Sequence, residues 1–185
     1  MTEPRSYSGW HQFLPGATPW LAVSVLVIVA DLWTKAWASA SLDLGRPQVV
    51  NEYLDFTLLH NYGAAFSLLA DAGGWQKFFF VALAAIVSGL LVIWMVRLPE
   101  RGRVILALSL ALIVGGALGN LYDRATLGYV VDFLHFHYNE HYWPAFNVAD
   151  TAISIGVALM ILDSLLYKEP GDVPAAESPD KEEGA

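Results

Sequence analysis

Long apolar segments alternate with shorter polar ones along most of this chain. The clearest, Phe78–Val96, has 19 residues without a charge, between Lys77 and Arg97. At a rise of about 1.5 Å per residue, such a helix crosses a hydrocarbon core of about 30 Å. Comparable segments lie at about 20–38, 104–122 and 146–167. The pattern therefore predicts an all-α polytopic membrane protein, with four transmembrane helices in a single domain of residues 1–167.

Basic residues orient these helices. Arg97, Arg101 and Arg103 crowd the short connection between the second and third spans. Because basic residues concentrate in cytoplasmic loops, this connection is expected in the cytoplasm. Four spans then place both termini in the cytoplasm and the two longer loops, 42–75 and 124–143, outside.

The first span is expected to begin at Thr18-Pro19, a threonine cap followed by proline at the first helical position. A cleaved signal peptide is the alternative, because the apolar run Trp20–Ala30 is short and Ala38–Ala40 resembles a cleavage site. Asp31 and Lys35 stand between that run and that site. They favour a retained span.

The outside loops carry different patterns. Gln48–Asn51 and Phe56–His60 are rich in β-branched and aromatic residues, which predicts a small β-structured flap. In the second loop we expect a short interfacial helix over Ala125–Phe136. Asp71, in an Asp-Ala-Gly-Gly sequence, is expected to be a structural turn and helix cap.

Composition excludes several classes of function. Only 15% of the residues are charged, against about 25% in soluble proteins. Half of the net charge of −8 comes from Lys168–Ala185, which has six acids and two lysines and is expected to be a disordered cytoplasmic tail. Without a basic patch, nucleic acid is not an expected partner. The absence of cysteine excludes thiol catalysis, thiolate metal sites and a cysteine-anchored lipoprotein.

Three aspartates, Asp123, Asp132 and Asp150, stand among apolar or small residues. An acid at hydrocarbon depth costs about 2.5–3.5 kcal/mol on insertion scales, so its default interpretation is functional. The predicted topology brings all three near the outer surface. Asp163 falls at the cytoplasmic end of the fourth span and is not a candidate.

Two carboxylates that share a site keep one proton between them and titrate as a unit. The ionised member can activate water, while the neutral member donates a proton to a peptide carbonyl. Spacing alone does not settle which two acids pair. Asp123 precedes Arg124 and shares a helical face with Asn120, and an ion-paired acid shares protons poorly. Asp132 and Asp150 are therefore the better candidates.

Other motifs have a structural and a functional interpretation. Asp31 and Lys35 are four residues apart, which suits an ion pair that either lets the helix insert or braces a site. Gly115 and Gly119 form a GxxxG, for which helix packing is the expected role.

The outer loops hold two weaker motifs. Asn61 and Gly63 place an amide beside accessible backbone, which suits either a bound extended peptide or a simple turn. The polar residues of the second outer loop suggest a metal site, but aromatic and histidine side chains at a membrane surface explain them equally well. They are His135, His137, Glu140 and His141.

Five blocks of the sequence resemble, in order, those of lipoprotein signal peptidase, the bacterial signal peptidase II. They are Asp31–Lys35 (DLWTK), Asn61–Phe66 (NYGAAF), Gly115–Arg124 (GGALGNLYDR), Val130–Phe133 (VVDF) and Phe146–Asp150 (FNVAD). The resemblance covers nearly everything from the first span to the fourth. It implies an inner-membrane aspartyl peptidase, without cofactor or metal, that cuts prolipoproteins just before a diacylglyceryl-modified cysteine. It also implies inhibition by globomycin-type peptides, and we expect a monomer.

Carried over by position, the resemblance puts the catalytic pair at Asp132 and Asp150. The residues implied to line or support the site are Asn61, Gly63, Asn120, Arg124, Asn147, Ala149, Asp31, Lys35 and Asp123. Tyr62 departs from the threonine of many members, which affects the pocket lip rather than the catalytic residues. Two rival functions remain: an ion-coupled transporter, although no internal repeat is evident, and a noncatalytic scaffold, which leaves the acids unexplained.

Overall fold

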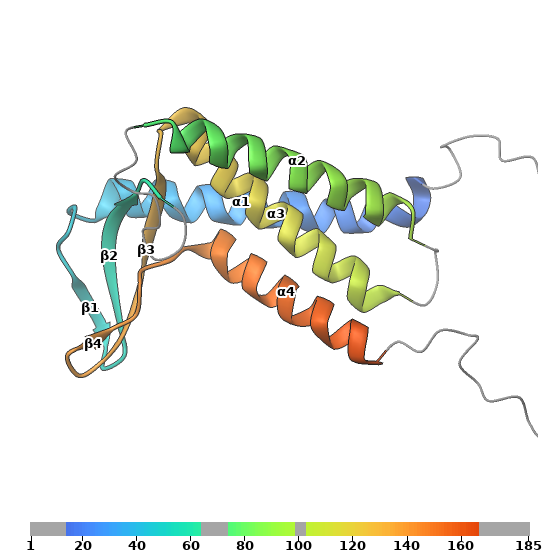
Figure 1. Ribbon diagram of the computed structural model, residues 1–185. Coiled ribbons are helices and arrows are strands. Elements are labelled where there is room, and N and C mark those ends of the chain that lie inside the picture. The colour runs from blue at the N-terminus through green and yellow to red at the C-terminus, as the bar shows by residue number, and fades with distance from the viewer. Residues whose placement is uncertain (1–13, 64–73, 99–102, 167–185) are drawn as a thin grey trace, which may run out of the picture.

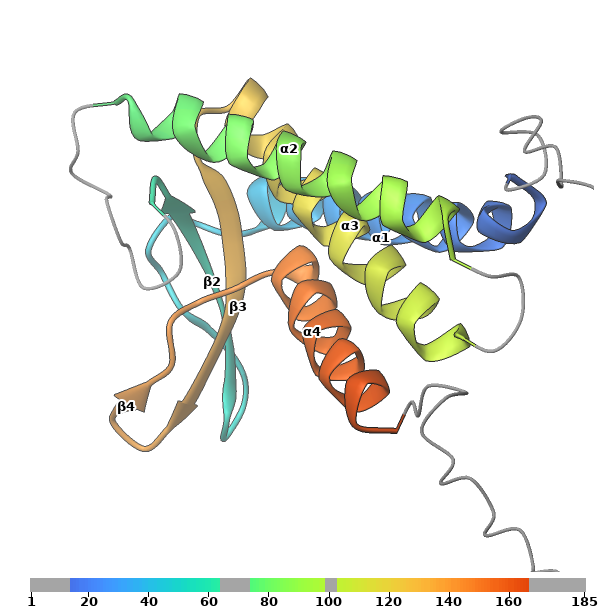
Figure 2. The same cartoon turned by 45° about the vertical axis from the view of Figure 1, so that its right-hand side comes forward.

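The computed structural model describes residues 14–63, 74–98 and 103–166. Within them, four helices are long and apolar enough to cross a membrane, by length and composition. These helices are α1 (Leu14–Ser41), α2 (Gln76–Val96), α3 (Val104–Thr126) and α4 (Val148–Leu166). In both views of the fold, α3 runs among the other three helices (Figures 1 and 2). The four predicted transmembrane helices are thus present.

The beginning of α1 differs from the prediction. The helix begins at Leu14, before the expected start at Thr18, and Pro19 lies inside it. Pro19 is the sixth residue of α1, beyond the first four N–H groups that have no partner within a helix, so its ring removes one helical hydrogen bond near the beginning of α1. Pro19 therefore did not mark the start of the helix.

A four-stranded antiparallel sheet covers one end of the helix bundle (Figure 1). Its strands, in spatial order, are β1 (Gln48–Asn51), β2 (Leu54–Asn61), β3 (Val130–Tyr138) and β4 (His141–Tyr142). The predicted strands in the first loop are confirmed as β1 and β2. The register of the sheet sets Leu59 opposite Asp132 and Asn61 opposite Val130, which brings two distant parts of the chain together.

The predicted interfacial helix over Ala125–Phe136 is wrong. Helix α3 continues to Thr126, the chain turns at Gly128 with a φ of 88°, and β3 follows from Val130. Glycine adopts this left-handed conformation without strain and commonly ends helices. The β-branched and aromatic residues of β3 then pair with β2, a partner that local sequence does not reveal.

Glycines let α3 approach its neighbours closely. A Cβ on Gly115 would lie 2.7 Å from the Val27 Cβ, and one on Gly119 would lie 2.5 Å from the Asp31 Oδ2, both on α1. Gly116 sits in the same way against the Ala149 backbone of α4. The packing role expected for Gly115 and Gly119 agrees with these distances.

Two clusters of buried apolar side chains pack at opposite ends of the molecule. At the sheet end, Ala38 of α1 packs with Leu58, Val131 and Phe133 of the sheet. At the opposite end, Met95 packs with α3 residues that include Leu110. Between these clusters, large apolar side chains remain exposed, such as Phe78, Leu90 and Ile161, as expected of surfaces that face lipid.

Asp163, which the sequence placed away from the site, lies at the end opposite the sheet. Its carboxylate is buried and pairs with Arg103 at 2.6 Å. Several predictions fall outside the described residues: the cap at Asp71, Arg101 of the basic loop, the end of the NYGAAF block and the tail 168–185.

Candidate functional site

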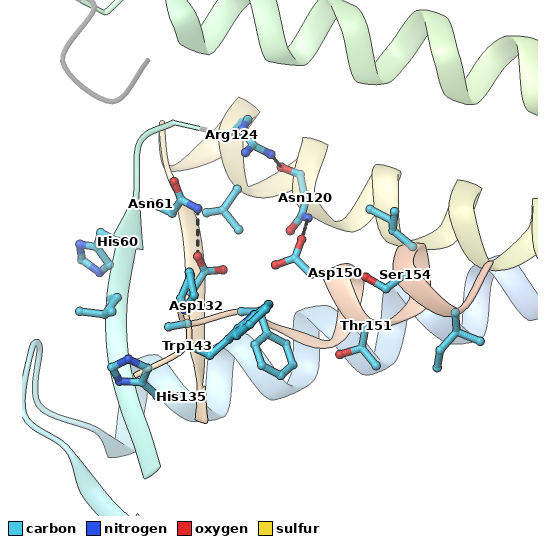
Figure 3. A pocket seen from close by; sticks show the side chains of 17 residues that line it. His60, Asn61, Asn120, Arg124, Asp132, His135, Trp143, Asp150, Thr151 and Ser154 are labelled. Carbon is cyan, nitrogen blue, oxygen red and sulfur yellow. Dashed lines mark hydrogen bonds between the residues drawn. The ribbon is translucent and has the colours of Figure 1, made fainter. Parts of the chain in front are cut away.

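A cavity of about 890 Å³ opens where the sheet meets α3 and α4. Asp132 enters it from β3 and Asp150 from α4, and the two carboxyl groups face each other across it (Figure 3). Polar lining residues also come from β2 and α3, as Figure 3 shows. They include His60, Asn61, Asn120 and Arg124. Two of the three candidate acids thus share one cavity, and Asp123 is not among its lining residues.

The beginning of α4 fixes the position of Asp150. The Asn147 Oδ1 accepts a hydrogen bond from the Asp150 N–H at 2.9 Å, as a helix N-cap does. The Ala149 N–H donates to the Asp31 Oδ1, also at 2.9 Å. Because the first N–H groups of a helix lack partners within it, both bonds satisfy donors that would otherwise stay unpaired. Asp150 is therefore anchored through its own backbone.

Asp132 is held by two amides. The Asn61 Nδ2 donates to its Oδ2 at 3.0 Å, and the Asn147 Nδ2 donates to its Oδ1 at 2.7 Å. Burial, and after it the negative charge of Asp150, raises the pKa of Asp132 to about 7, although the two amides oppose the shift. A carboxyl with this pKa keeps its proton through most of the acidic range and loses it as the pH rises through about 7.

Asn120 connects Asp150 to a buried lysine. Its Nδ2 donates to the Asp150 Oδ1 at 2.7 Å, and its Oδ1 accepts from the Lys35 Nζ at 2.9 Å. The Asn147 Nδ2 is also 3.3 Å from that Oδ1. In each of these asparagines, the amide nitrogen donates to a carboxylate and the amide oxygen accepts a hydrogen bond. The two bonds together fix the orientation of the amide.

Lys35 closes a separate buried cluster with two of the acids. Its Nζ lies 2.7 Å from the Asp31 Oδ2 and 3.0 Å from the Asp123 Oδ2. The side chains of Lys35, Asp31 and Asp123 are only 3%, 0% and 4% exposed. The Asp123 Oδ2 also accepts from the Val131 N–H at 3.1 Å, which ties α3 to β3.

Arg124 does not play the part expected from its place beside Asp123. Its Nη2 donates to the Gly63 carbonyl at 2.9 Å, and its guanidinium lies 5.2 Å from the centre of the Phe80 ring. The Gly63 N–H in turn donates to the Asn61 Oδ1 at 3.0 Å. Asp123 is ion-paired, as predicted, but its partner is Lys35 of α1. Arg124 instead anchors the segment that carries Asn61.

The histidines of the second loop lie in the sheet. His135 lines the cavity and its Nδ1 is 3.2 Å from the Thr57 Oγ1, whereas the His137 Nε2 is 3.4 Å from the Asp55 Oδ1. Burial lowers the pKa of His135 and of His60. In the part of the chain that the structure describes, no group of three or more His, Cys, Asp or Glu side chains is arranged to hold a metal ion.

Sequence reasoning missed several residues that line the cavity. They are His60, Trp143, Phe146, Thr151 and Ser154, among others. Thr151 and Ser154 each lie four residues after a predicted site residue, Asn147 and Asp150 respectively, so helical spacing offered that signal. The positions of Trp143 and Phe146 depend on how β3 turns into α4, and the sequence holds no local signal for that.

This arrangement supports acid–base chemistry on a bound carbonyl compound. Two carboxyls face one cavity, and each receives hydrogen bonds from amides that cannot ionise. Close carboxyls of this kind can divide the roles of proton acceptor and proton donor.

Comparison with known proteins agrees with this geometry. The family model for signal peptidase (SPase) II matches residues 23–166. A lipoprotein signal peptidase of Acinetobacter baumannii is 52% identical over 169 residues, covering 91% of this chain and 96% of that protein. A lipoprotein signal peptidase of Teredinibacter turnerae is 56% identical over 149 residues, covering 80% of this chain and 88% of that protein.

The fold also matches a solved structure. A bacterial membrane enzyme, determined by the in meso method at 2.3 Å resolution, superposes with a TM-score of 0.73 at 28% identity, covering 87% of this chain and 94% of the other. The chain therefore belongs to the signal peptidase II family, and it is a multi-pass membrane protease that removes signal peptides from lipoproteins.

Proposed function

We propose that this protein is an aspartyl peptidase in which Asp132 and Asp150 together activate water. The observation that carries the proposal is that these two carboxyls face one cavity while Asp31 and Asp123 are both bound by Lys35. A pair without an adjacent lysine can share a proton, which a lysine-bound acid does poorly.

The mechanism uses one proton and one water molecule. With a pKa near 7, Asp132 holds the shared proton, and Asp150 is the base. Asp150 takes a proton from water as the water oxygen attacks the peptide carbonyl carbon, and Asp132 gives its proton to the carbonyl oxygen. The resulting gem-diol collapses when Asp150 returns a proton to the departing nitrogen and a hydroxyl proton goes back to Asp132. The C–N bond breaks and the pair regains its starting state.

The remaining predicted site residues take supporting roles in this proposal. Asn61, Asn120 and Asn147 orient the two carboxyls, and Ala149 offers the backbone N–H that Asp31 fixes. The Lys35 cluster, with Asp31 and Asp123, holds α1 and α3 beneath the pair. Arg124 and Gly63 keep the end of β2 in place.

The proposed substrate is a prolipoprotein whose cysteine carries diacylglycerol, cut just before that cysteine. Lipid attached to the cysteine would keep the scissile bond at the bilayer boundary, where a cavity lined by both the sheet and the helices can receive it. We further propose a bacterial inner-membrane location, with both termini cytoplasmic and the sheet at the outer face. A monomer would suffice, and a globomycin-type peptide would compete for the same cavity.

The test is cleavage of a diacylglyceryl-modified prolipoprotein in detergent micelles, with mass analysis of the new N-terminus. We expect wild type to release a product that begins at the modified cysteine, and the Asp132→Asn and Asp150→Asn proteins to be inactive while folded. Asparagine keeps size and polarity but cannot transfer the proton. Asp123→Asn is the matched control and should retain measurable cleavage. No product from wild type, or full activity of either site variant, would overturn the proposal.

A further inference from the structure

Helix α4 carries a hydroxyl that faces the cavity and has no hydrogen-bond partner among the residues that the structure describes. Ser154 lies four residues after Asp150, on the same face of the helix, and its side chain points into the cavity (Figure 3). The neighbouring Thr151 hydroxyl donates to the Asn147 carbonyl at 2.9 Å. Among residues 14–63, 74–98 and 103–166, in contrast, no hydrogen bond engages the Ser154 hydroxyl.

Ser154 is also the last polar group along α4 before a wholly apolar segment. From Ile155 to Leu162 every residue is apolar or glycine. The side chains of Ile153 and Ile155, beside Ser154, also line the cavity. The cavity thus changes from polar to apolar within one helical turn of Asp150, and Ser154 supplies the hydroxyl at that boundary.

A peptide entering this cavity needs hydrogen-bond donors at that boundary. Cleavage requires an extended backbone at the scissile bond, so the signal peptide loses helical hydrogen bonds just before that bond. An unpaired backbone carbonyl in hydrocarbon costs several kcal/mol. The apolar part of a signal peptide leads back into the bilayer and therefore passes the Ser154 end of the cavity.

We propose that the Ser154 hydroxyl donates to a backbone carbonyl of the signal peptide, on the N-terminal side of the scissile bond. This makes Ser154 a positioning residue that recognises unwound peptide backbone rather than any side chain. The inference rests on the proposed function, because it needs the peptide to be cut between Asp132 and Asp150.

The first test compares three variants on the modified prolipoprotein. Ser154→Ala should raise KM about three- to tenfold with kcat nearly unchanged, the change expected from losing one neutral hydrogen bond. Ser154→Thr keeps the hydroxyl and should restore KM to within about twofold. Ser164→Ala is the matched control, because that serine lies on the same helix but bonds the Ile161 carbonyl at 2.7 Å. It should behave as wild type.

The second test identifies the acceptor. In synthetic lipopeptides, each of the three amides before the scissile bond is replaced in turn by an ester, whose carbonyl accepts hydrogen bonds more weakly. One ester should raise KM for wild type but not for Ser154→Ala. If wild type cleaves nothing, the proposed function fails. If wild type cleaves and Ser154→Ala has the KM of wild type, or the ester effects are the same in both proteins, the Ser154 inference fails and the proposed function stands.

Discussion

Asn120 links two pairs of aspartates in this protein, through Lys35 on one side and Asp150 on the other, and the surroundings of the two pairs are opposite. Asp31 and Asp123 are bound by Lys35 and almost completely buried. Asp132 is as buried as Asp123, but Asp132 and Asp150 line a cavity and receive hydrogen bonds from asparagines. The four acids are chemically identical side chains. The partner that the fold supplies therefore decides which pair holds the helices together and which remains able to exchange protons.

The comparison also explains why asparagines surround Asp132 and Asp150, which we call the open pair. An amide can orient a carboxyl without fixing its charge, whereas a lysine favours the ionised carboxylate. Asn120 stands between the two regions, since its nitrogen bonds Asp150 and its oxygen bonds Lys35. Lys35, Asp31 and Asp123, which we call the closed cluster, thereby help to position the open pair without neutralising it.

The largest expected effect comes from breaking the closed cluster. Lys35→Met removes the cation and leaves Asp31 and Asp123 buried together without compensation. Removing one partner of a buried ion pair typically costs about 3–5 kcal/mol. We expect the variant to fold poorly or to show a strongly lowered Tm in micelles. A Tm close to that of wild type would mean that the cluster is not structural.

The open pair should respond in the opposite way to removal of charge. The Asp132 carboxyl keeps its proton in the folded protein up to a pKa of about 7, while the unfolded chain releases it above 3.8. The fold is therefore favoured at acidic pH, and this contribution is lost as the pH rises through about 7. Asp132→Asn has no such loss, so its stability relative to wild type should increase from pH 5 to pH 8.

At about 1.4 kcal/mol per pKa unit, the two units between pH 5 and the pKa of about 7 set an upper bound of about 3 kcal/mol for this gain. Thermal unfolding of both proteins at several pH values measures it. Other titrating groups, such as His60 and His135, cancel in the difference between variant and wild type. If the difference in Tm between Asp132→Asn and wild type does not change with pH, the shared proton does not reside on Asp132.

A smaller effect tests how closely α3 must approach the closed cluster. A Cβ on Gly119 would lie 2.5 Å from the Asp31 Oδ2, whereas a Cβ on Gly89 of α2 has no neighbour within 4 Å. Gly119→Ala should therefore cost about 1–3 kcal/mol by overpacking. Gly89→Ala should be neutral or slightly stabilising, because alanine favours helix. Equal Tm values for the two variants would argue against tight packing at Gly119.

The smallest effect is expected at an ion pair in water. Arg46 and Asp43 lie 3.5 Å apart with side chains 80% and 75% exposed. Exposed pairs contribute about 0–1 kcal/mol, so Arg46→Ala should change Tm very little. If Arg46→Ala lowered Tm as much as Lys35→Met, burial would not explain why one ion pair stabilises the fold more than the other.

The local sequence predicted some of these features but not others. The spacing of Asp31 and Lys35 predicted their pairing, and hydrophobic segments predicted the four helices. In contrast, the third member of the closed cluster, Asp123, depends on how α1 and α3 pack. The neighbouring Arg124 was the more obvious partner in the sequence.

The sheet shows the same limit. Strands β1 and β2 were predicted from their composition, but β3 was mistaken for a helix because its pairing with β2 links residues about seventy positions apart. That pairing brings Asn61 to Asp132. Conversely, the choice of Asp132 and Asp150 as the candidate pair needed only their apolar neighbours and the resemblance of their blocks.

The most direct test of the central claim measures cleavage at pH 6 and Tm at pH 8 for Asp132→Asn and Asp123→Asn, in the same micelles. For Asp132→Asn we predict a loss of cleavage of about 10²–10⁴-fold, the usual contribution of a general acid–base group, with Tm equal to or above that of wild type. For Asp123→Asn we predict a lowered Tm with measurable cleavage. The reverse result, in which Asp123→Asn is stable but inactive and Asp132→Asn is active but unstable, would contradict the account.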